Sequence, residues 1–333
     1  MLRKSIVALL FLKATALTAW DWADVFCSED GCAEWVVSAD ALYWRVKEQG
    51  LKFGPSLFVE VEMIEQISMA EYEHTSKAIP REFHWGGRLG ISRENRLSGW
   101  SLDGYWTHLV GSCSSQIASQ NQAKWRFQFD TLVLHLGYLF YLNRCLQMKG
   151  IFGLEAGWIK QKISSEWLDK LLTQSDLLFR HVEKKNRSSY SGIGPKIGLL
   201  AEWQLCGNWN VYGSCTGAAW LGQFDLHHHK REPSLSSSQL ESLQAASANP
   251  FLRRQHGHSE NGSGSAFSHK HRQKTQYVID AAIGVKWQDL FCNWYDISLG
   301  VAYEYYRIFD QNQLEHSGDL IMDGITLSGQ VTF

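Results

Sequence analysis

The histidines of segment 225–274 are the residues whose type most directly suggests chemistry. Imidazole is the commonest metal ligand in proteins, but this set lacks the fixed ligand spacing of structural zinc sites. The same His and Ser residues match no spacing of a nucleophile and its base. We therefore predict a solvated surface loop, with no bound metal, no cofactor, no catalytic residue and no enzymatic activity. The histidines are His227, His228, His229, His256, His258, His269 and His271.

Ionisable residues recur at every second position of several apolar segments, opposite to the apolar side chains. If these segments are strands, the charges share one face of a sheet. An enclosed, net acidic face would favour cations through its carboxylates, whereas pairing between the charges would fill a narrow interior. Both alternatives stay open. The candidates for lining a pore are Asp40, Arg88, Asp103, Glu155, Lys196, Glu202, Asp280, Lys286, Asp296 and Glu304.

The sequence contains seven cysteines. An odd number in an exported protein indicates a free thiol or a bridge to another chain. Cys27 and Cys32 are close enough in the chain to close a small loop, and Cys145, Cys206 and Cys292 lie in or beside short predicted turns. These five are disulfide candidates, and inert or internally paired thiols are the alternative.

An alternation of period two, typical of strands, runs through the segments that carry these residues. In the last segment Ile325, Leu327, Val331 and Phe333 fall on one side and polar residues on the other. A half-buried soluble strand alternates in the same way, but its final aromatic residue would be frayed. The ending resembles the assembly signal of bacterial outer-membrane proteins, with Phe333 as the residue that closes a barrel.

Ten such segments follow one another, and each is long enough for a tilted strand to cross a membrane. Two carry warnings. The alternation slips near Asp130, which predicts a bulge, and Pro195 lies inside a strand although proline cannot donate to a ladder. The predicted strands are 34–46, 83–92, 99–109, 124–141, 149–159, 191–203, 209–224, 275–287, 293–308 and 320–333.

The connections between these strands alternate in length. Long extracellular loops and short periplasmic turns are typical of outer-membrane barrels, whereas a soluble sandwich has no physical reason to alternate them. We therefore predict an all-β fold, a transmembrane antiparallel β-barrel of about ten strands with both termini in the periplasm. The long connections are the odd ones, 47–82, 110–123, 160–190, 225–274 and 309–319.

The first residues have the layout of a secretory signal peptide. Arg3 and Lys4 precede an apolar run, and Ala14-Thr15-Ala16 offers a cleavage site. Cleavage positions up to about residue 24 are alternatives. The predicted organisation is a signal peptide at 1–16, a periplasmic segment at 17–33 and the barrel at 34–333, with long surface loops near 47–82, 163–187 and 225–274.

Composition agrees with a barrel. The 15 Trp, 12 Tyr and 16 Phe suit aromatic girdles at the two membrane interfaces. The mean hydropathy of -0.25 does not oppose this, because alternating strands conceal their membrane signal. Removing Arg3, Lys4 and Lys13 with the signal peptide leaves 29 of the 32 basic residues against 34 acidic ones. This balance argues against a nucleic-acid partner.

Four motifs occur in order along the predicted strands. They are E-W-V-V-S-A-D-A-L-Y-W-R-V-K-E-Q-G-L at 34–51, G-W-S-L-D-G-Y-W-T at 99–107, G-L-E-A-G-W-I at 153–159 and G-I-G-P-K-I-G-L at 192–199. Their order and spacing resemble the pore-forming major outer-membrane proteins of Legionella and the Chlamydia-like bacteria, from 34 to 333. The resemblance implies a porin of the bacterial outer membrane, supplies no catalytic residue, and implies disulfide cross-links to neighbouring envelope proteins.

We predict a porin with a narrow aqueous channel for passive diffusion of small solutes or ions, and a structural role as an abundant envelope protein is an added option. Ten strands make a small barrel, but inward glycines such as Gly194 and Gly284 leave space. The alternatives are a surface adhesin or a structural barrel without an open pore, and an enzyme is the least favoured. The predicted partners are outer-membrane lipid, the barrel-assembly machinery through the C-terminal strand, disulfide-linked envelope proteins and further copies of the chain.

Overall fold

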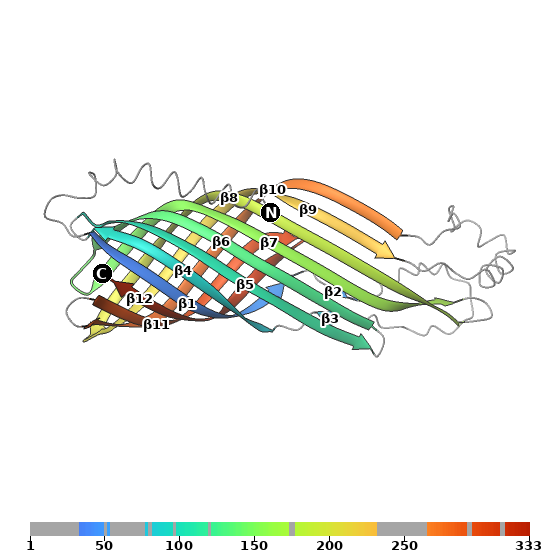
Figure 1. The fold of residues 1–333 in the computed structure, drawn as a ribbon, viewed down its shortest axis with the longest axis horizontal. Helices are drawn as coiled ribbons and strands as arrows, with labels where there is room; N and C mark the ends of the chain where they lie inside the picture. Colours follow the sequence, from blue (N-terminus) through green and yellow to red (C-terminus); the bar gives the residue numbers. More distant parts are fainter. Residues whose placement is uncertain are drawn as a thin grey trace, which may run out of the picture.

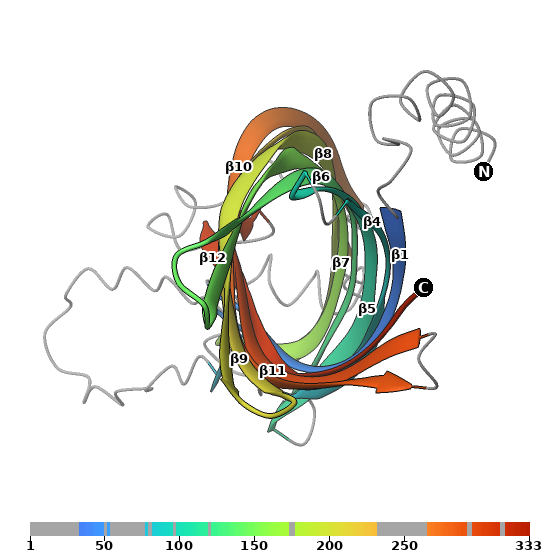
Figure 2. The same ribbon diagram turned by 90° about the vertical axis from the view of Figure 1, so that its left-hand side faces the viewer.

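Ten strands of the chain close into one antiparallel barrel (Figures 1 and 2). The strands follow chain order around the wall, and β1 pairs with both β4 and β12. This confirms the predicted fold. The computed structural model describes residues 33–49, 52–53, 77–78, 82–95, 98–118, 121–172, 177–231, 265–291, 295–313 and 317–333.

The barrel strands differ in length, and the longest are β7, β8 and β10. A separate pair is formed by β2 (Lys52–Phe53) and β3 (Lys77–Ala78). Within the described residues there is no helix long and apolar enough to cross a membrane. The barrel strands are β1 (Ala33–Glu48), β4 (Phe83–Asn95), β5 (Trp100–Ala118), β6 (Asn121–Tyr141), β7 (Leu146–Leu172), β8 (Leu177–Cys206), β9 (Trp209–Arg231), β10 (Ser265–Phe291), β11 (Tyr295–Asn312) and β12 (Gly318–Thr332).

The C-terminal strand closes the barrel, as predicted. The backbone N–H of Phe333 donates to the carbonyl of Trp35 at 2.9 Å, and the N–H of Trp35 donates to the carbonyl of Phe333 at 2.8 Å. Ile325, Leu327 and Val331 are exposed on the outer face. The final residue is therefore held in the ladder instead of fraying.

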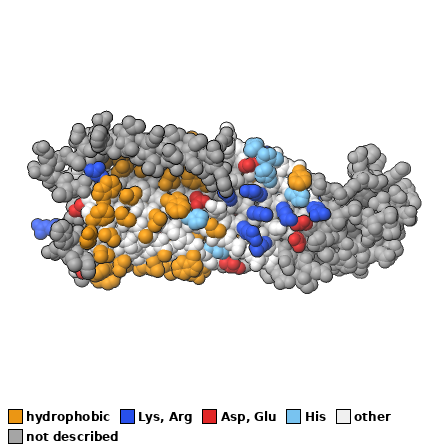
Figure 3. All heavy atoms as spheres, viewed as in Figure 1, with side chains coloured by type: hydrophobic (Ala, Val, Ile, Leu, Met, Phe, Trp, Pro, Cys, Tyr) orange, Lys and Arg blue, Asp and Glu red, His pale blue; other side chains and the backbone are white. Residues whose placement is uncertain are grey.

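An apolar belt surrounds the barrel near the end where β1 begins and β12 finishes, which we call the near end. Figure 3 shows hydrophobic side chains gathered over this part of the wall. Trp35 and Tyr43, eight residues apart on β1, mark its borders. At ~3.3 Å per residue and a tilt of ~40° they are separated by ~20 Å along the axis, close to the height of a membrane-facing band. The exposed belt residues include Leu89, Leu102, Leu134, Leu154, Ile197, Ile279, Leu299, Val301 and Leu327.

Aromatic side chains border the belt on both sides, as the composition predicts. Their amphipathic rings suit the two membrane interfaces. Residues on the border toward the near end are Trp35, Trp100, Tyr138, Trp203, Trp209 and Tyr295, and those on the other border are Tyr43, Trp85, Trp106, Trp158, Tyr277 and Tyr303.

Several strands continue far beyond the belt, which corrects the predicted loops. β5 and β6 are separated by residues 119–120, so the predicted connection 110–123 is mostly strand. β7 and β8 are paired up to Leu172 and Leu177, so the predicted loop 163–187 is paired strand except at 173–176, which lie outside the described residues. β9 and β10 include both ends of the predicted loop 225–274, and 232–264 lies outside the described residues. The segments at 1–32 and most of 47–82 also lie outside them.

The two irregularities noted in the sequence, at Asp130 and at Pro195, have different outcomes in the structure. The predicted bulge at Asp130 is wrong, because β5 and β6 pair without a shift from Trp100 opposite Tyr138 to Gln116 opposite Gln122. Pro195 does lie inside β8, opposite Leu154 of β7. Pairing of β8 with β9 lapses at Gly194 and Pro195 and resumes in the same register at Lys196, so the missing N–H of proline removes no ladder bond elsewhere.

Beyond the belt, on the side away from the near end, lies the far half of the barrel. On β6 it comprises residues 121–129 and on β7 residues 159–172. Here the wall reverses its polarity, because apolar side chains point inward and charged ones outward. The core of the molecule therefore sits inside the far half. Its almost fully buried members include Leu42, Trp44, Leu109, Trp125, Phe129, Ile159, Ile163, Tyr190, Trp220, Phe224, Ile308 and Leu320.

Candidate functional site

The inner face of the barrel is the candidate functional site. The structure turns the predicted charged residues inward, where they alternate along their strands with exposed apolar neighbours. Whether they line a conducting pore stays a prediction. What the structure adds is that eight of the ten are paired with one another.

Arg88 joins strands that are not neighbours. Its guanidinium makes a bidentate contact with Glu304 of β11, at 2.8 and 3.1 Å, and Nη1 lies 3.3 Å from a carboxylate oxygen of Asp40 on β1. Nε also donates to the hydroxyl of Thr107. Since β1 and β12 stand between β4 and β11, this charge-assisted pair reaches across the interior instead of along the wall.

Lys196 forms the second centre. Its Nζ lies 2.7 Å from Asp280 and 3.3 Å from Glu155, and both Lys196 and Glu155 are buried. The hydroxyl of Tyr306 on β11 donates to Glu155 of β7 at 3.0 Å. A single cation therefore holds two carboxylates, and Tyr306 ties this centre to the other side of the barrel.

Two further pairs lie toward the near end. Lys149 reaches across β6 to place Nζ 3.0 Å from Asp103, whose carboxylate is also 3.1 Å from Nε2 of His135. Lys286 of β10 lies 2.8 Å from Glu202 of β8. Both lysines skip one strand, so these contacts also narrow the interior.

Asp296 differs from the other predicted acidic residues because its partner is uncharged. The side-chain amide of Gln288 donates a hydrogen bond to its carboxylate. Beside the near end, a cavity of about 330 Å³ opens among polar residues that include Glu202, Asn210 and Gln288. The interior thus has room for solvent there, next to the Lys286–Glu202 pair.

The far half of the interior is crossed by aromatic side chains. The rings of Phe129 on β6 and Tyr306 on β11 lie 5.3 Å apart, although these strands are diametrically opposite in the ten-strand order. The amide of Gln161 on β7 donates to Glu48 on β1, another contact across the barrel. These contacts divide the lumen.

Trp220 adds a further apolar layer. It is completely buried, and a Cβ built on Gly157 would lie 2.3 Å from its ring. Glycine at this position therefore makes room for the indole. Trp220 and Phe224 both pack against Tyr190, at ring distances of 6.3 and 4.7 Å. The sequence prediction missed this layer, because it expected polar residues inside throughout.

Basic side chains form a row on the outer wall of the far half. Arg126, Lys162, Arg187, His227 and His269 stand directly opposite one another on β6 to β10, and all are exposed. We call this row, together with Lys124 and Lys160 beside it, the basic row. Figure 3 shows Lys and Arg side chains gathered beyond the hydrophobic belt.

Within the part of the chain that the structure describes, no carboxylate neutralises the Lys and Arg charges of the basic row. Among the described residues, Lys124, Arg126, Lys160, Lys162 and Arg187 form no ion pair. Asp225 lies beside the row, and its carboxylate is 2.6 Å from His269 and 3.3 Å from His227. The histidines that the sequence assigned to a loop thus lie partly on β9 and β10.

Among the residues that the structure describes, two groups of side chains have the donor atoms and spacing of a metal site. They are Glu82, His84 and Cys113 inside the barrel and Asp225, His269 and His271 on its outer wall. The first group combines carboxylate, imidazole and thiol donors, and the second has oxygen and nitrogen donors.

Of the five disulfide candidates, the structure describes the side chain of Cys145 alone. Cys145 is exposed and unbridged, and Cys113 and Cys215 are likewise free among the described thiols. The side chains of Cys27, Cys32, Cys206 and Cys292 lie outside the described residues. Disulfide formation stays a prediction.

The closed wall, the belt and the aromatic borders together define an outer-membrane β-barrel, located in the bacterial outer membrane. A family model described as "Legionella pneumophila major outer membrane protein precursor" matches residues 30–330. The chain belongs to this family, as its motifs predict. A comparison with curated proteins gave no match.

Solved structures of similar fold are outer-membrane barrels. The outer membrane protease OmpT from Escherichia coli is 9% identical, with a TM-score of 0.39 over 92% of this chain and 97% of that one. A major outer membrane protein from Thermus thermophilus is 11% identical, with a TM-score of 0.36 over 91% and 100%. The translocator domain of the autotransporter NalP from Neisseria meningitidis is 11% identical, with a TM-score of 0.35 over 99% and 96%. At these values the similarities carry no argument about activity.

Proposed function

We propose that the protein is an envelope barrel whose lumen is closed by its own side chains, so that it acts as a membrane-anchored structural protein rather than as a wide diffusion pore. The contact between Phe129 and Tyr306 carries this proposal, because the two rings meet across the full diameter of the barrel. The Arg88–Glu304 and Tyr306–Glu155 contacts support it at other positions. Pairing thus takes the place of an open charged lining.

Single-channel recording in planar bilayers tests the closure. The wild-type protein, with folding confirmed by its heat-dependent mobility on gels, is expected to insert without stepwise conductance. A variant that combines Phe129→Ala, Trp220→Ala and Tyr306→Ala removes the apolar layer and is expected to raise the ion leak. Regular conductance steps from the wild type would overturn the proposal.

The predicted narrow channel is the second candidate, and the cavity of about 330 Å³ near Glu202 favours it. The predicted inner set holds seven acidic and three basic residues, which would favour cations. A reversal potential measured in a salt gradient would report this preference if steps occur. An adhesive role would depend on 232–264, outside the described residues, and the absence of enzymatic activity stays a prediction.

We also propose that outer-leaflet lipid is a partner, bound by the belt and by the basic row through its phosphate groups. The row lies on the outer wall, three outward positions beyond Leu132 on β6, where it faces the headgroup region instead of the barrel mouth. Five fixed cations without ion-pair partners among the described residues offer charge-assisted hydrogen bonds to phosphate. The juxtaposition of an apolar belt with a basic row matches a phosphorylated glycolipid.

Binding of the purified barrel to diphosphorylated lipid A tests the lipid proposal. The variant Lys162→Gln/Arg187→Gln is expected to bind about tenfold more weakly, equivalent to ~1.4 kcal/mol for two exposed charge pairs. The control Lys47→Gln/Arg144→Gln removes the same charge away from the row and should bind normally. Equal binding of dephosphorylated lipid A would contradict the role of the phosphates.

The remaining partner expectations stay predictions. The outward row of β12 that ends at Phe333 is what the barrel-assembly machinery would recognise. Cys145, exposed in the β6–β7 turn, is the described thiol best placed for a bridge to another envelope protein. Gels run with and without reductant would detect such a bridge, and would also show linked copies of the chain.

A further inference from the structure

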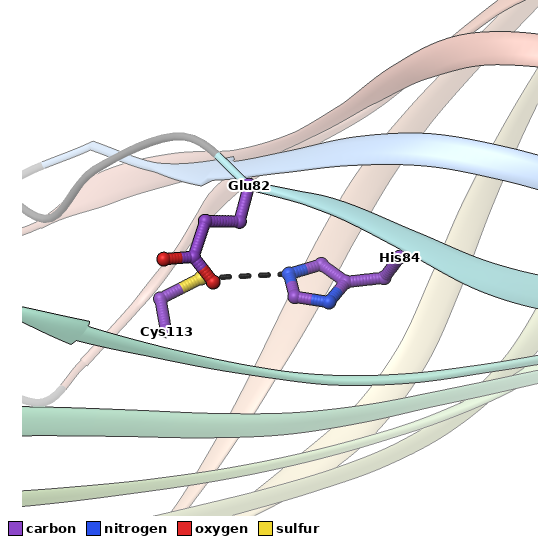
Figure 4. A group of neighbouring side chains, drawn as sticks. All are labelled: Glu82, His84 and Cys113. Atoms are coloured by element: carbon purple, nitrogen blue, oxygen red, sulfur yellow. Dashed lines mark hydrogen bonds between the residues drawn. The ribbon is translucent and has the colours of Figure 1, made fainter.

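Glu82, His84 and Cys113 converge inside the far half of the barrel (Figure 4). Sγ of Cys113 lies 3.4 Å from Nε2 of His84, and one donor atom from each residue lies within 4.8 Å of the others. We propose that these three side chains bind a divalent zinc ion. The site links the beginning of β4 to β5.

The strand register brings the three donors together. β4 and β5 pair with Gly86 opposite Leu109, and continuing this register places His84 opposite Gly111 and Glu82 opposite Cys113. Glu82 and His84 are two residues apart and therefore share the inner face with Cys113. His84 lies on β4 and Cys113 on β5, whereas Glu82 directly precedes β4, so the two strands fix the positions of two of the three ligands.

Gly111 provides the space for the imidazole. A Cβ built on this glycine would lie 2.6 Å from Cγ of His84 and 2.4 Å from the ring of Phe127. The ring of Phe127 also packs edge-on against His84, with centroids 5.1 Å apart. The imidazole is thus confined between a glycine and an aromatic ring, which fixes the direction of Nε2.

The donor set suits zinc. Thiolate, imidazole and carboxylate are its three usual protein ligands, and three of them leave one position for water. With the carboxylate and the thiolate charged, the ligands carry two negative charges against the two positive charges of the ion. The backbone of Glu82 also hydrogen-bonds the sulfur of Cys113, the kind of outer contact that orients a ligand.

Binding proceeds without any change of oxidation state. Zinc replaces the thiol proton of Cys113, which leaves to solvent, and it takes the lone pair of Nε2 from a neutral His84. Glu82 is exposed and His84 partly so, so the ion has a path from solvent. Cys113 itself is buried and supplies the inner end of the site.

The Asp225, His269 and His271 group is a weaker candidate. Its histidines are exposed, and Arg187 and Lys162 stand in the same row as His269. Their positive charges oppose a second cation. This group therefore serves as an internal control for the site at Cys113.

Cobalt provides a spectroscopic test on the full-length barrel in detergent, after chelator treatment. We expect one Co²⁺ per chain, a thiolate-to-cobalt charge-transfer band, and loss of that band when Zn²⁺ is added. Cys113→Ser should abolish the band, and Gly111→Ala should weaken cobalt binding by displacing the imidazole. The controls Cys145→Ser, Cys215→Ser and His269→Ala should leave it unchanged.

X-ray absorption at the zinc edge of the wild-type protein gives a second readout that requires no variant. It should show one sulfur neighbour at ~2.3 Å together with nitrogen or oxygen neighbours. A band that survives Cys113→Ser in a folded barrel, a folded wild type that gives no band, or a zinc spectrum without sulfur would each overturn the proposal.

Discussion

The belt half and the far half of the barrel are built from the same strands with opposite polarity. On β6, Leu134 faces outward and His135 inward within the belt, whereas Arg126 faces outward and Trp125 inward beyond it. The backbone ladder does not change between them, since pairing with β5 and β7 is continuous. What differs is the medium that surrounds the wall.

An alternating sequence thus carries two kinds of information. A period of two indicates that a segment is a strand, and the side on which its apolar residues fall indicates which face is away from water. In the belt half hydrocarbon lies outside and the charges pair within. In the far half the surroundings are polar, so the interior is packed as in a soluble protein. The exchange occurs near Asp130, whose carboxylate faces outward and contacts His108.

The largest predicted effect concerns the packed interior of the far half. Trp220→Ala should lower the free energy of unfolding by about 3–5 kcal/mol, because it leaves a cavity where a completely buried indole packs. Urea titration followed by heat-dependent gel mobility measures the change. The outward control Phe267→Ala, 78% exposed, should change stability by at most about 0.5 kcal/mol. Equal effects would mean that the far half has no packed interior.

The next effect concerns the charged interior of the belt half. Lys196→Met removes the cation that Glu155 and Asp280 share and should cost about 3 kcal/mol, because two carboxylates are left without a partner. Adding Glu155→Gln and Asp280→Asn should restore most of the loss. A small loss in the single variant, under ~1 kcal/mol, would show that water solvates these carboxylates, which would favour the open channel.

The belt half could be predicted from the sequence because its outer row is apolar and its inner row polar. Ile325, Leu327 and Phe333 show this pattern, with Gly329 as the one gap in the outer row. The far half was misread because its rows exchange roles. The slip near Asp130, interpreted as a bulge, is this exchange, and Trp125, Phe127 and Phe129 continue the alternation in the inverted sense.

The contacts across the barrel could not be predicted. Arg88 and Glu304 are separated by 216 residues, and only the closed ring with its particular register brings them together. The same holds for Phe129 and Tyr306. Sequence periodicity assigns a side chain to a face, but it does not say which residue it meets on the opposite wall.

The third prediction tests the boundary between the halves on a single strand. Leu134→Arg places a charge on the lipid-facing surface and should destabilise the barrel by about 2–4 kcal/mol in bilayers. Gln128→Arg, on the same outer row but beyond Asp130, should change stability by at most about 0.5 kcal/mol. Both are measured by urea unfolding in vesicles. Similar losses at the two positions would place the far half inside the membrane.

The smallest effect concerns the outer wall of the far half. Burial raises the pKa of Asp225, but the hydrogen bond from His269 and the charges of His227, His269 and His271 outweigh it and leave the pKa below its ordinary value. The carboxylate is 42% exposed, so its contribution is discounted for solvent to about 0.5 kcal/mol or less. Asp225→Asn should lower stability by this amount at pH 6.

The pH dependence gives the sign of this contribution. A carboxylate whose folded-state pKa is depressed stabilises the protein above its unfolded-state pKa of about 3.9 and loses that stabilisation as the pH falls through the folded-state value. The difference between wild type and Asp225→Asn should therefore shrink as the pH falls below about 3.9 and vanish once the pH is below the folded-state pKa. It should also shrink in high salt, because exposed charges are screened. A difference that grew on acidification would mean that Asp225 is not stabilised by its histidines, and the far half would then owe its stability to its interior alone.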